Sequence, residues 1–203
     1  MGGLFHKVHI DTMVMPRSGG YQYIVQAQCA LTAYLEWRML QSKNASVIAS
    51  FIFKDIFCHW GAVSELVTDN SPAFIQALDV LTSRSGICHI RISPYNSQAN
   101  GVVERHHCDV QEAIVKSTLG GEIRWSVTAH SVFWAERITI LKSTGLSPYF
   151  MVHGIKPLFP FDLSEATFLV PVPDTDDITT PILIAWRARQ LQKHQEDIDT
   201  ICE

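Results

Sequence analysis

The first forty residues alternate between apolar and polar positions in three successive runs. Residues 7–15 carry apolar side chains on both faces, which is typical of a central strand. A turn over residues 16–20 leads to two further β-rich runs, at 21–29 and 33–39. Because the links between these runs are short, the pattern predicts a meander of three antiparallel strands.

From Asn44 to Trp60 the apolar positions change to the period of a helix. One broad apolar stripe is formed by Ala45, Ile48, Ala49, Ile52, Phe53, Ile56, Phe57 and Trp60. Gly61 follows directly and is typical of a helix C-terminus. The segment therefore predicts a helix that packs this stripe against the strands.

Strands and helices alternate in the rest of the chain. A short buried strand over 65–69 precedes a helix with Ser71 as its N-cap and Pro72 in its first turn. Residues 87–92 predict another strand. Further helices are predicted at 100–119, with Val103, Val110 and Ile114 inward, at 125–140, at 148–152 and from Thr180 onward. The order predicts an α/β fold with a mixed five-stranded sheet, its first three strands antiparallel, flanked by helices.

The charged residues divide the chain into a body and an acidic tail. Residues 1–161 carry 13 Lys and Arg against 11 Asp and Glu, whereas residues 162–203 carry 3 against 9. A chain of 203 residues is the size of one ordinary domain with a short appendage. We expect a core at 1–163 and, at 164–203, an acidic connector that ends in a helix. If three acids of the core bind metal, its remaining surface can approach phosphate groups.

Cysteine usage and hydropathy indicate an intracellular chain that does not enter a membrane. The five cysteines are scattered without a CxxC pair, which is typical of reduced thiols. The longest apolar run, 47–53, is far too short to span a bilayer. No membrane partner is expected.

Three acids from separate elements are the candidate chemistry of this chain. Asp11 interrupts a buried strand, where an unpaired charge is costly, and Asp69 ends the fourth strand. Glu104 lies at the border of the apolar stripe of its helix. Carboxylates without a Cys/His cage favour hard divalent cations. Any one of these acids, taken alone, is more often a solvated surface carboxylate.

Two other sets of residues invite weaker interpretations. A zinc site would draw on His6, His9, His106, His107 and Cys108. Adjacent helical residues point to different sides, so core packing or a surface role is favoured for the last three. The cations that can contact phosphate are Arg84, Arg91, Arg105, Lys116 and Lys142. Of these, only Arg105 has an argument from placement, since it follows Glu104.

Three phrases resemble the catalytic core of retroviral and retrotransposon integrases, and within them the gypsy-type LTR retrotransposons of a fungal lineage. The first is TDNSPAF at 68–74, and the second is SPYNSQANGVVER at 93–105. The third is STGLSPY at 143–149, continued by Val-His-Gly at 152–154. The resemblance covers residues 6–163, and the three phrases together are highly specific.

The resemblance implies an RNase H-like fold and a DDE-type polynucleotidyl transferase that uses two Mg²⁺ or Mn²⁺ ions. Asp11, Asp69 and Glu104 match the metal-binding triad of the family. DNA contacts are implied for the active-site loop residues Tyr95, Asn96, Gln98, Asn100 and Gly101, and for the adjacent Arg105. The implied partners are element-end and target DNA and further copies of the chain, as a homodimer or higher multimer. The implied location is the nucleus, with the chain as part of a larger polyprotein.

The chain departs from the family pattern in three ways. Asp69 and Glu104 are separated by 34 residues, one fewer than usual, and Ser71 replaces the usual glycine. The zinc-binding domain before the core and the chromodomain or small barrel after it are not found in these residues, which indicates an excised core or a decayed gene copy. Two alternatives therefore stay open: a nuclease that only hydrolyses, and a catalytically weak remnant or adopted DNA-binding or interaction module.

Overall fold

The computed structural model describes residues 3–92, 110–114, 116–117, 124–157, 179–182, 184–189 and 192. The chain forms two compact units, Met1–Arg105 and His106–Glu203, and each is described by itself. The predicted division between 163 and 164 falls outside the described residues and stays a prediction.

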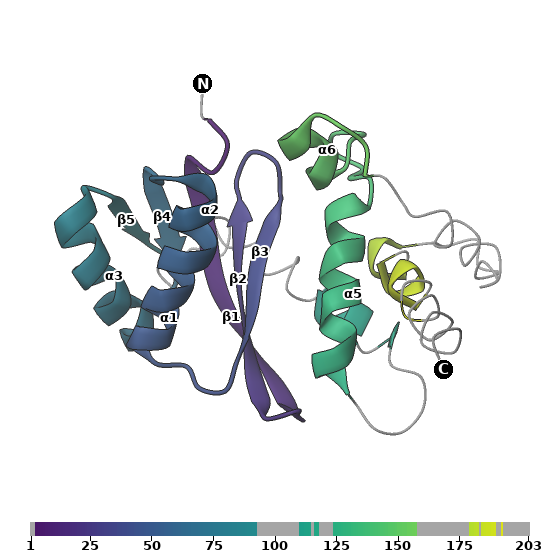
Figure 1. The fold of residues 1–203 in the computed structure, drawn as a ribbon, viewed down its shortest axis with the longest axis horizontal. Coiled ribbons are helices and arrows are strands. Elements are labelled where there is room, and N and C mark those ends of the chain that lie inside the picture. Colours follow the sequence, from purple (N-terminus) through teal and green to yellow (C-terminus); the bar gives the residue numbers. More distant parts are fainter. Residues whose placement is uncertain are drawn as a thin grey trace. The chain divides into compact units, whose positions relative to one another are not determined.

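In the described part of the first unit, five strands form one sheet (Figure 1). The strands are β1 Lys7–Ser18, β2 Tyr21–Cys29, β3 Leu35–Leu40, β4 Glu65–Thr68 and β5 Cys88–Arg91. Their order across the sheet is β3-β2-β1-β4-β5. β1 and β3 pair antiparallel with β2, whereas β4 pairs parallel with β1 and with β5. The predicted mixed five-stranded sheet with three antiparallel strands at its start is confirmed.

β1 is longer than its predicted range, and the predicted turn over 16–20 is wrong in extent. The strand continues through Pro16 to Ser18, and its pairing with β2 shifts register between Val14 and Ser18. A proline has no N–H for the ladder, so it is tolerated where the pairing is interrupted. The turn itself is made by Gly19 and Gly20, with φ of 58° and 85°.

The predicted helix over 44–60 is continuous but changes its winding. It consists of α1 Ala45–Phe51, a π-helical segment η1 Ile52–Phe57 and α2 Cys58–Trp60. The Asn44 side chain caps it by accepting a hydrogen bond from the Val47 N–H at 3.0 Å. The central stripe is confirmed, since Ile48, Ile52 and Ile56 are fully buried.

Phe53 is the exception to that stripe, because 54% of its surface is exposed. The i→i+5 bonds of a π-helix widen the turn, so residues inside it leave the 100° spacing of an α-helix. Phe53 lies in η1 and is therefore rotated off the face that the sequence pattern predicts.

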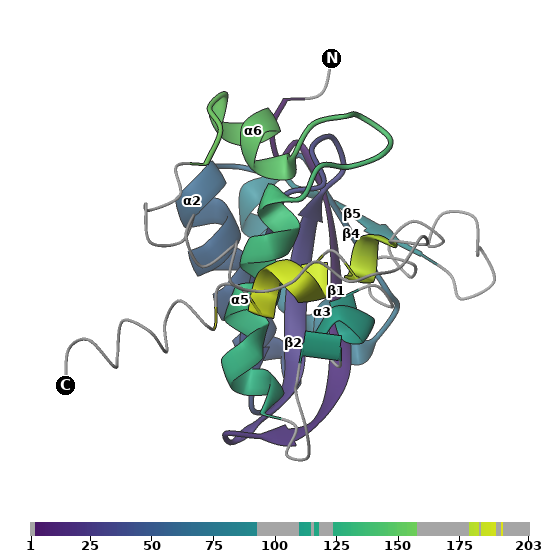
Figure 2. The same cartoon turned by 90° about the vertical axis from the view of Figure 1, so that its right-hand side faces the viewer.

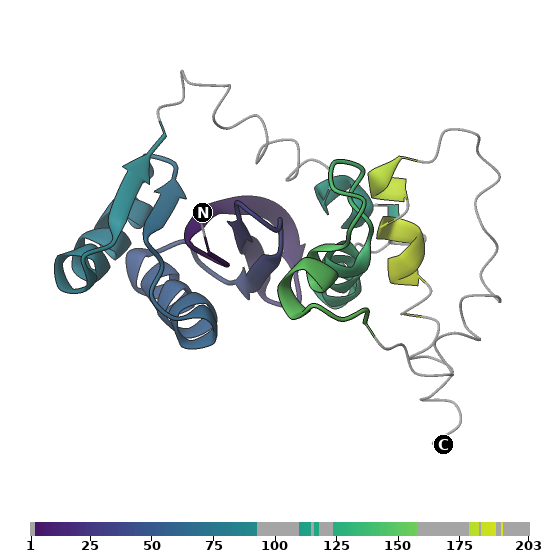
Figure 3. The ribbon, with the colours of Figure 1, turned by 90° about the horizontal axis from the view of Figure 1, so that it is seen from above.

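α3, Pro72–Ser85, begins after Ser71 and ends at Gly86, whose φ is 65°. The helix start is predicted correctly, but the Ser71 hydroxyl makes no capping hydrogen bond and is buried without a partner. Phe74 and Leu78 on the inner face are fully buried. α1 and α3 pack together on one face of the sheet (Figure 3).

Aromatic and polar contacts join the helix over 45–60 to the strands. The Phe5 and Trp60 rings stack with centroids 4.0 Å apart, and the Trp60 indole N–H donates to Glu36 on β3 at 2.9 Å. Arg38, also on β3, donates to the Asp55 carboxylate at 2.8 Å. These contacts span residues distant in sequence and hold the helix against the antiparallel half of the sheet.

The second unit is helical in all the segments that the structure describes. α5 is Trp125–Ile138 and α6 is Pro148–His153, and residues 180–182 and 184–189 are helical and lie beside α5 (Figure 2). Its fully buried side chains are Val110, Ala113, Ile114, Trp125, Ala129, Val132, Phe133, Ala135 and Ala188. In both units, the described helices are too short or too polar to cross a membrane.

Two histidines are partly buried in the parallel half of the sheet. His9 lies on β1 and His89 on β5. Burial, followed by the charge of Lys7, lowers the pKa of His9. Burial, followed by the charge of Arg91, also lowers the pKa of His89, against an opposing effect of Asp79. The folded chain therefore favours both imidazoles in the neutral form.

We predict that Leu66→Ala lowers the free energy of unfolding by about 2–5 kcal/mol, because Leu66 is fully buried on β4 and its removal leaves a cavity. Val14→Ala on β1 is the control, since Val14 is 64% exposed. We expect that control to change stability by less than about 0.5 kcal/mol. Urea denaturation followed by circular dichroism measures both, and an equal effect of the two variants would contradict the burial argument.

We also predict that stability falls as the pH is lowered. Above the unfolded-state histidine pKa of about 6.5, both imidazoles are neutral in either state and the chain has its full stability. Below it, the unfolded chain binds protons more readily than the folded one, so unfolding becomes easier. Urea denaturation at about pH 7.5 and about pH 5.5 measures the loss. His89→Gln should reduce it, and an unchanged loss in that variant would exclude His89 as a cause.

Candidate active site

The parallel pairing of β1 with β4 sets Asp11 and Asp69 at the same height. His9 is paired with Val67, and each aspartate lies two residues further along its chain. Because strand side chains alternate between faces, both aspartates project from the face that carries His9. Two residues before His9 and Val67, the register partners Lys7 and Glu65 form an ion pair, with Nζ and Oε2 3.4 Å apart. This contact agrees with the register.

The two aspartates line one small hollow of about 20 Å³. Its other lining residues are His9, Ile10, Val67, Thr68 and Ile92. A space of this size holds roughly one water molecule or one small ion. The structure therefore brings Asp11 and Asp69 together, whereas the predicted convergence of all three acids stays a prediction because Glu104 lies outside the described residues.

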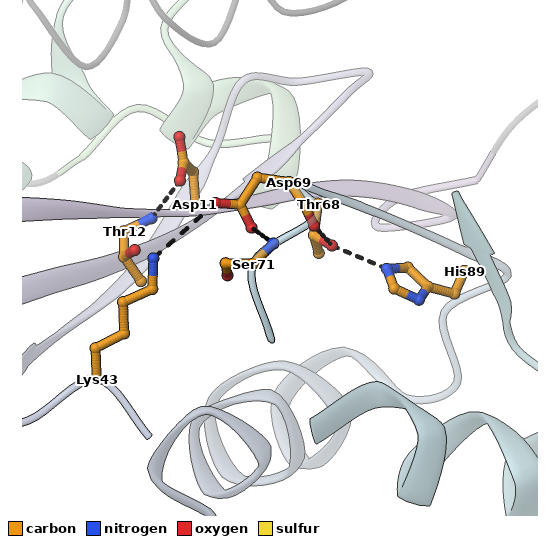
Figure 4. A network of polar contacts seen from close by, with 7 residues as sticks. All are labelled: Asp11, Thr12, Lys43, Thr68, Asp69, Ser71 and His89. Carbon is orange, nitrogen blue, oxygen red and sulfur yellow. Dashed lines mark hydrogen bonds and ion pairs between the residues drawn. The ribbon is translucent and has the colours of Figure 1, made fainter. Parts of the chain in front are cut away.

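Contacts on both its backbone and its side chain hold Asp69 in place. Its Oδ1 accepts a hydrogen bond from the Ser71 N–H at 3.0 Å, and its Oδ2 lies 4.0 Å from Lys43 Nζ (Figure 4). Its backbone carbonyl accepts from the Thr68 hydroxyl at 2.9 Å. The side chain is nevertheless 40% exposed, so its carboxylate can still reach a ligand.

His89 supports this arrangement through Thr68. The Thr68 hydroxyl is buried and lies 2.8 Å from His89 Nε2. Since that hydroxyl donates its single proton to the Asp69 carbonyl, it accepts from His89, and Nε2 carries the ring proton. A histidine on β5 thus sets the direction of a hydroxyl that holds the strand end at Asp69.

Asp11 is oriented locally. Its Oδ1 accepts a hydrogen bond from the N–H of the next residue, Thr12, at 2.6 Å. Its register partner on β2 is Gln26, which is buried. Figure 4 shows the Asp69 carboxylate turned toward Asp11 and Lys43. The acid therefore lies partly buried on a strand with neighbours on both sides, as the sequence predicts.

The remaining predicted site residues lie outside the described residues. They are Tyr95, Asn96, Gln98, Asn100, Gly101, Glu104 and Arg105. Their roles stay predictions. Lys43, Thr68 and His89 were not predicted as site residues. Thr68 lies inside the TDN phrase, which is a usable signal, but nothing around Lys43 in the sequence distinguishes it from a solvated lysine.

The donor set fits a hard divalent cation. Within the described segments, no group of three or more His, Cys, Asp or Glu residues gathers as a metal cage. Two carboxylates in one hollow match the way Mg²⁺ is held, by one or two carboxylates together with waters and substrate phosphates. His9 lines the same hollow. Because burial lowers its pKa, the folded chain favours the neutral imidazole, which adds no positive charge to the hollow.

The sequence has relatives among retroviral and transposon polyproteins. No protein-family model matches it. It is 28% identical to the Gag-Pol polyprotein of feline leukemia virus over 92% of this chain and 10% of that protein. It is 26% identical to the retrovirus-related Pol polyprotein from transposon 412 of Drosophila melanogaster, over 96% of this chain and 17% of that protein. The chain thus spans only a small part of these relatives.

Solved integrase structures share the fold. A chain of the simian T-cell lymphotropic virus intasome, solved with the PP2A regulatory subunit B56 gamma, matches 86% of this chain with a TM-score of 0.59 and 20% identity, over 59% of that chain. The catalytic core domain of BIV integrase matches 73% with a TM-score of 0.56 and 20% identity, over 94% of that domain. The predicted RNase H-like fold is confirmed, whereas the gypsy-type fungal lineage stays a prediction. The chain is similar in sequence to retroviral and transposon Pol polyproteins, and it shares the fold of the catalytic core domain of BIV integrase.

Proposed function

We propose that this chain is a metal-dependent polynucleotidyl transferase core that cleaves the 3′ end of element DNA and joins it to target DNA. The observation that carries the proposal is the pair of aspartates, Asp11 and Asp69, that face one hollow from neighbouring parallel strands. A site of two acids, one within a strand and one just after the end of its neighbour, is suited to phosphate chemistry. The sequence relatives and structural neighbours favour integration over other reactions of this fold.

Asp11, Asp69 and Glu104 are the proposed ligands of two Mg²⁺ or Mn²⁺ ions. When bound, such ions neutralise charge at phosphorus and stabilise the attacking and leaving oxygens. The protein contributes by positioning the carboxylates. Asp69 is held by Ser71 and Thr68, so its carboxylate needs little rearrangement to accept a ligand.

The proposed reaction is two in-line displacements. A water oxygen first attacks a phosphorus near the element end, and the departing oxygen becomes a free 3′-hydroxyl. That hydroxyl then attacks a target phosphodiester, and the displaced target 3′ oxygen leaves. Neither step needs a covalent bond to the protein. The proposed DNA contacts are Tyr95, Asn96, Gln98, Asn100, Gly101 and Arg105, carried over from the SPYNSQANGVVER phrase.

DNA and further copies of the chain are the proposed partners, and the nucleus is the proposed location. The matched simian virus chain comes from the structure of an intasome, which supports the first two.

We predict that Asp11→Asn and Asp69→Asn each lower DNA joining by about a hundredfold or more, because losing about 2.7 kcal/mol of transition-state stabilisation has that effect. Asparagine keeps the shape of the side chain and removes its charge. Asp79→Asn on α3 is the matched control, since its carboxylate is 62% exposed and does not line the hollow. Strand-transfer and disintegration assays with Mn²⁺ measure the products, and chelation of the metal should abolish them.

The same assays separate the alternatives. Joined products that depend on both aspartates support the proposed reaction. Cleavage without joining indicates a nuclease that only hydrolyses, and DNA binding without turnover indicates an adopted binding module. Wild-type turnover in both asparagine variants would refute the proposed site.

A further inference from the structure

Lys43 is the cation that lies beside the candidate metal ligand Asp69. It precedes Asn44, the N-cap of α1, in the link from β3. Its Nζ lies 4.0 Å from Asp69 Oδ2 (Figure 4). The side chain is 26% exposed, less than that of Asp69, so the ammonium lies against the protein and is not fully solvated.

A second contact holds the ammonium at this place. Lys43 Nζ lies 5.6 Å from the centroid of the Phe74 ring, which is within the range of a cation–π interaction. Phe74 is fully buried in the first turns of α3. Because α1 and α3 pack against each other, the helix start that carries Lys43 and the ring beneath its ammonium belong to one packed structure.

The two carboxylate oxygens of Asp69 have different roles. Oδ1 accepts the Ser71 N–H and holds the side chain in place, whereas Oδ2 faces Lys43. A divalent cation bound at the hollow needs an Asp69 oxygen and would lie within a few ångströms of the ammonium. Like charges at that separation repel each other, so the two cations compete for Oδ2.

We infer that Lys43 is the resident counter-cation of Asp69, and that a divalent metal ion must displace its ammonium in order to bind there. The inference rests on the proposed function, because it takes Asp69 as a metal ligand. Lys43 thereby lowers metal affinity in the absence of DNA. Its ammonium, once displaced, stays tethered to the helix start beside the site.

Partly exposed ion pairs have modest energies, so the expected effect is also modest. Removing the Lys43 charge should tighten Mn²⁺ binding by about twofold to fivefold at low ionic strength. Monovalent salt screens the pair, so the difference between the variant and the wild type should shrink as salt is added. A purely structural role for Lys43 would not produce that salt dependence.

The test measures Mn²⁺ binding to the full 203-residue chain by the electron paramagnetic resonance signal of free Mn²⁺. Lys43→Met is compared with Lys54→Met, the matched control, because Lys54 is exposed on η1 and does not line the hollow. Lys43→Arg keeps the charge and should bind Mn²⁺ like the wild type. Lys43→Gln is a second neutral variant in case Lys43→Met fails to fold, and circular dichroism checks all four.

The inference is supported if both neutral variants at position 43 bind Mn²⁺ more tightly while Lys54→Met and Lys43→Arg do not. It is overturned if the neutral variants bind Mn²⁺ as the wild type does or more weakly. If the wild type binds no Mn²⁺, or if Asp69→Asn binds it equally well, the proposed metal site itself fails and this inference fails with it.

Discussion

Parallel pairing of β1 with β4 is the constraint on which the candidate site depends. Val8 and Leu66 are register partners, and both are fully buried. Because side chains alternate between the two faces of a sheet, His9 and Asp11 on β1 project from the face opposite Val8. Val67 and Asp69 likewise project from the face opposite Leu66. A slip of one residue would reverse every side chain of a strand. Burial of apolar side chains on one face therefore keeps the two aspartates level on the other.

Once the register is set, polar contacts decide how the carboxylates are presented. Asp69 comes directly after a strand end, where its backbone is held by Thr68 and its side chain by Ser71. These bonds leave one oxygen directed toward a cation, at present Lys43. In the proposed metal site, the arrangement that orients the acid also supplies a competing positive charge, so metal affinity would reflect the balance between them.

Much of the fold follows from local patterns, because periodicity of two or 3.6 residues reports which face is buried. The strands are confirmed in this way, and the helix start at Pro72 is confirmed from the proline in its first turn. The errors occur where a contact or a winding change overrides the pattern. β1 passes through Pro16 because its register with β2 shifts there, Phe53 turns outward because η1 is wound as a π-helix, and the Ser71 hydroxyl makes no cap bond.

By itself, the sequence determined which residue types are present, their order, and the phrases around Asp11, Asp69 and Glu104 that resemble integrases. Only the tertiary structure decided that Asp11 and Asp69 share a hollow, that His89 supports Thr68, and that Lys43 faces Asp69. The reason is physical. Those contacts join strands and helix starts that are far apart along the chain, and contacts between such elements leave no periodic trace in the sequence.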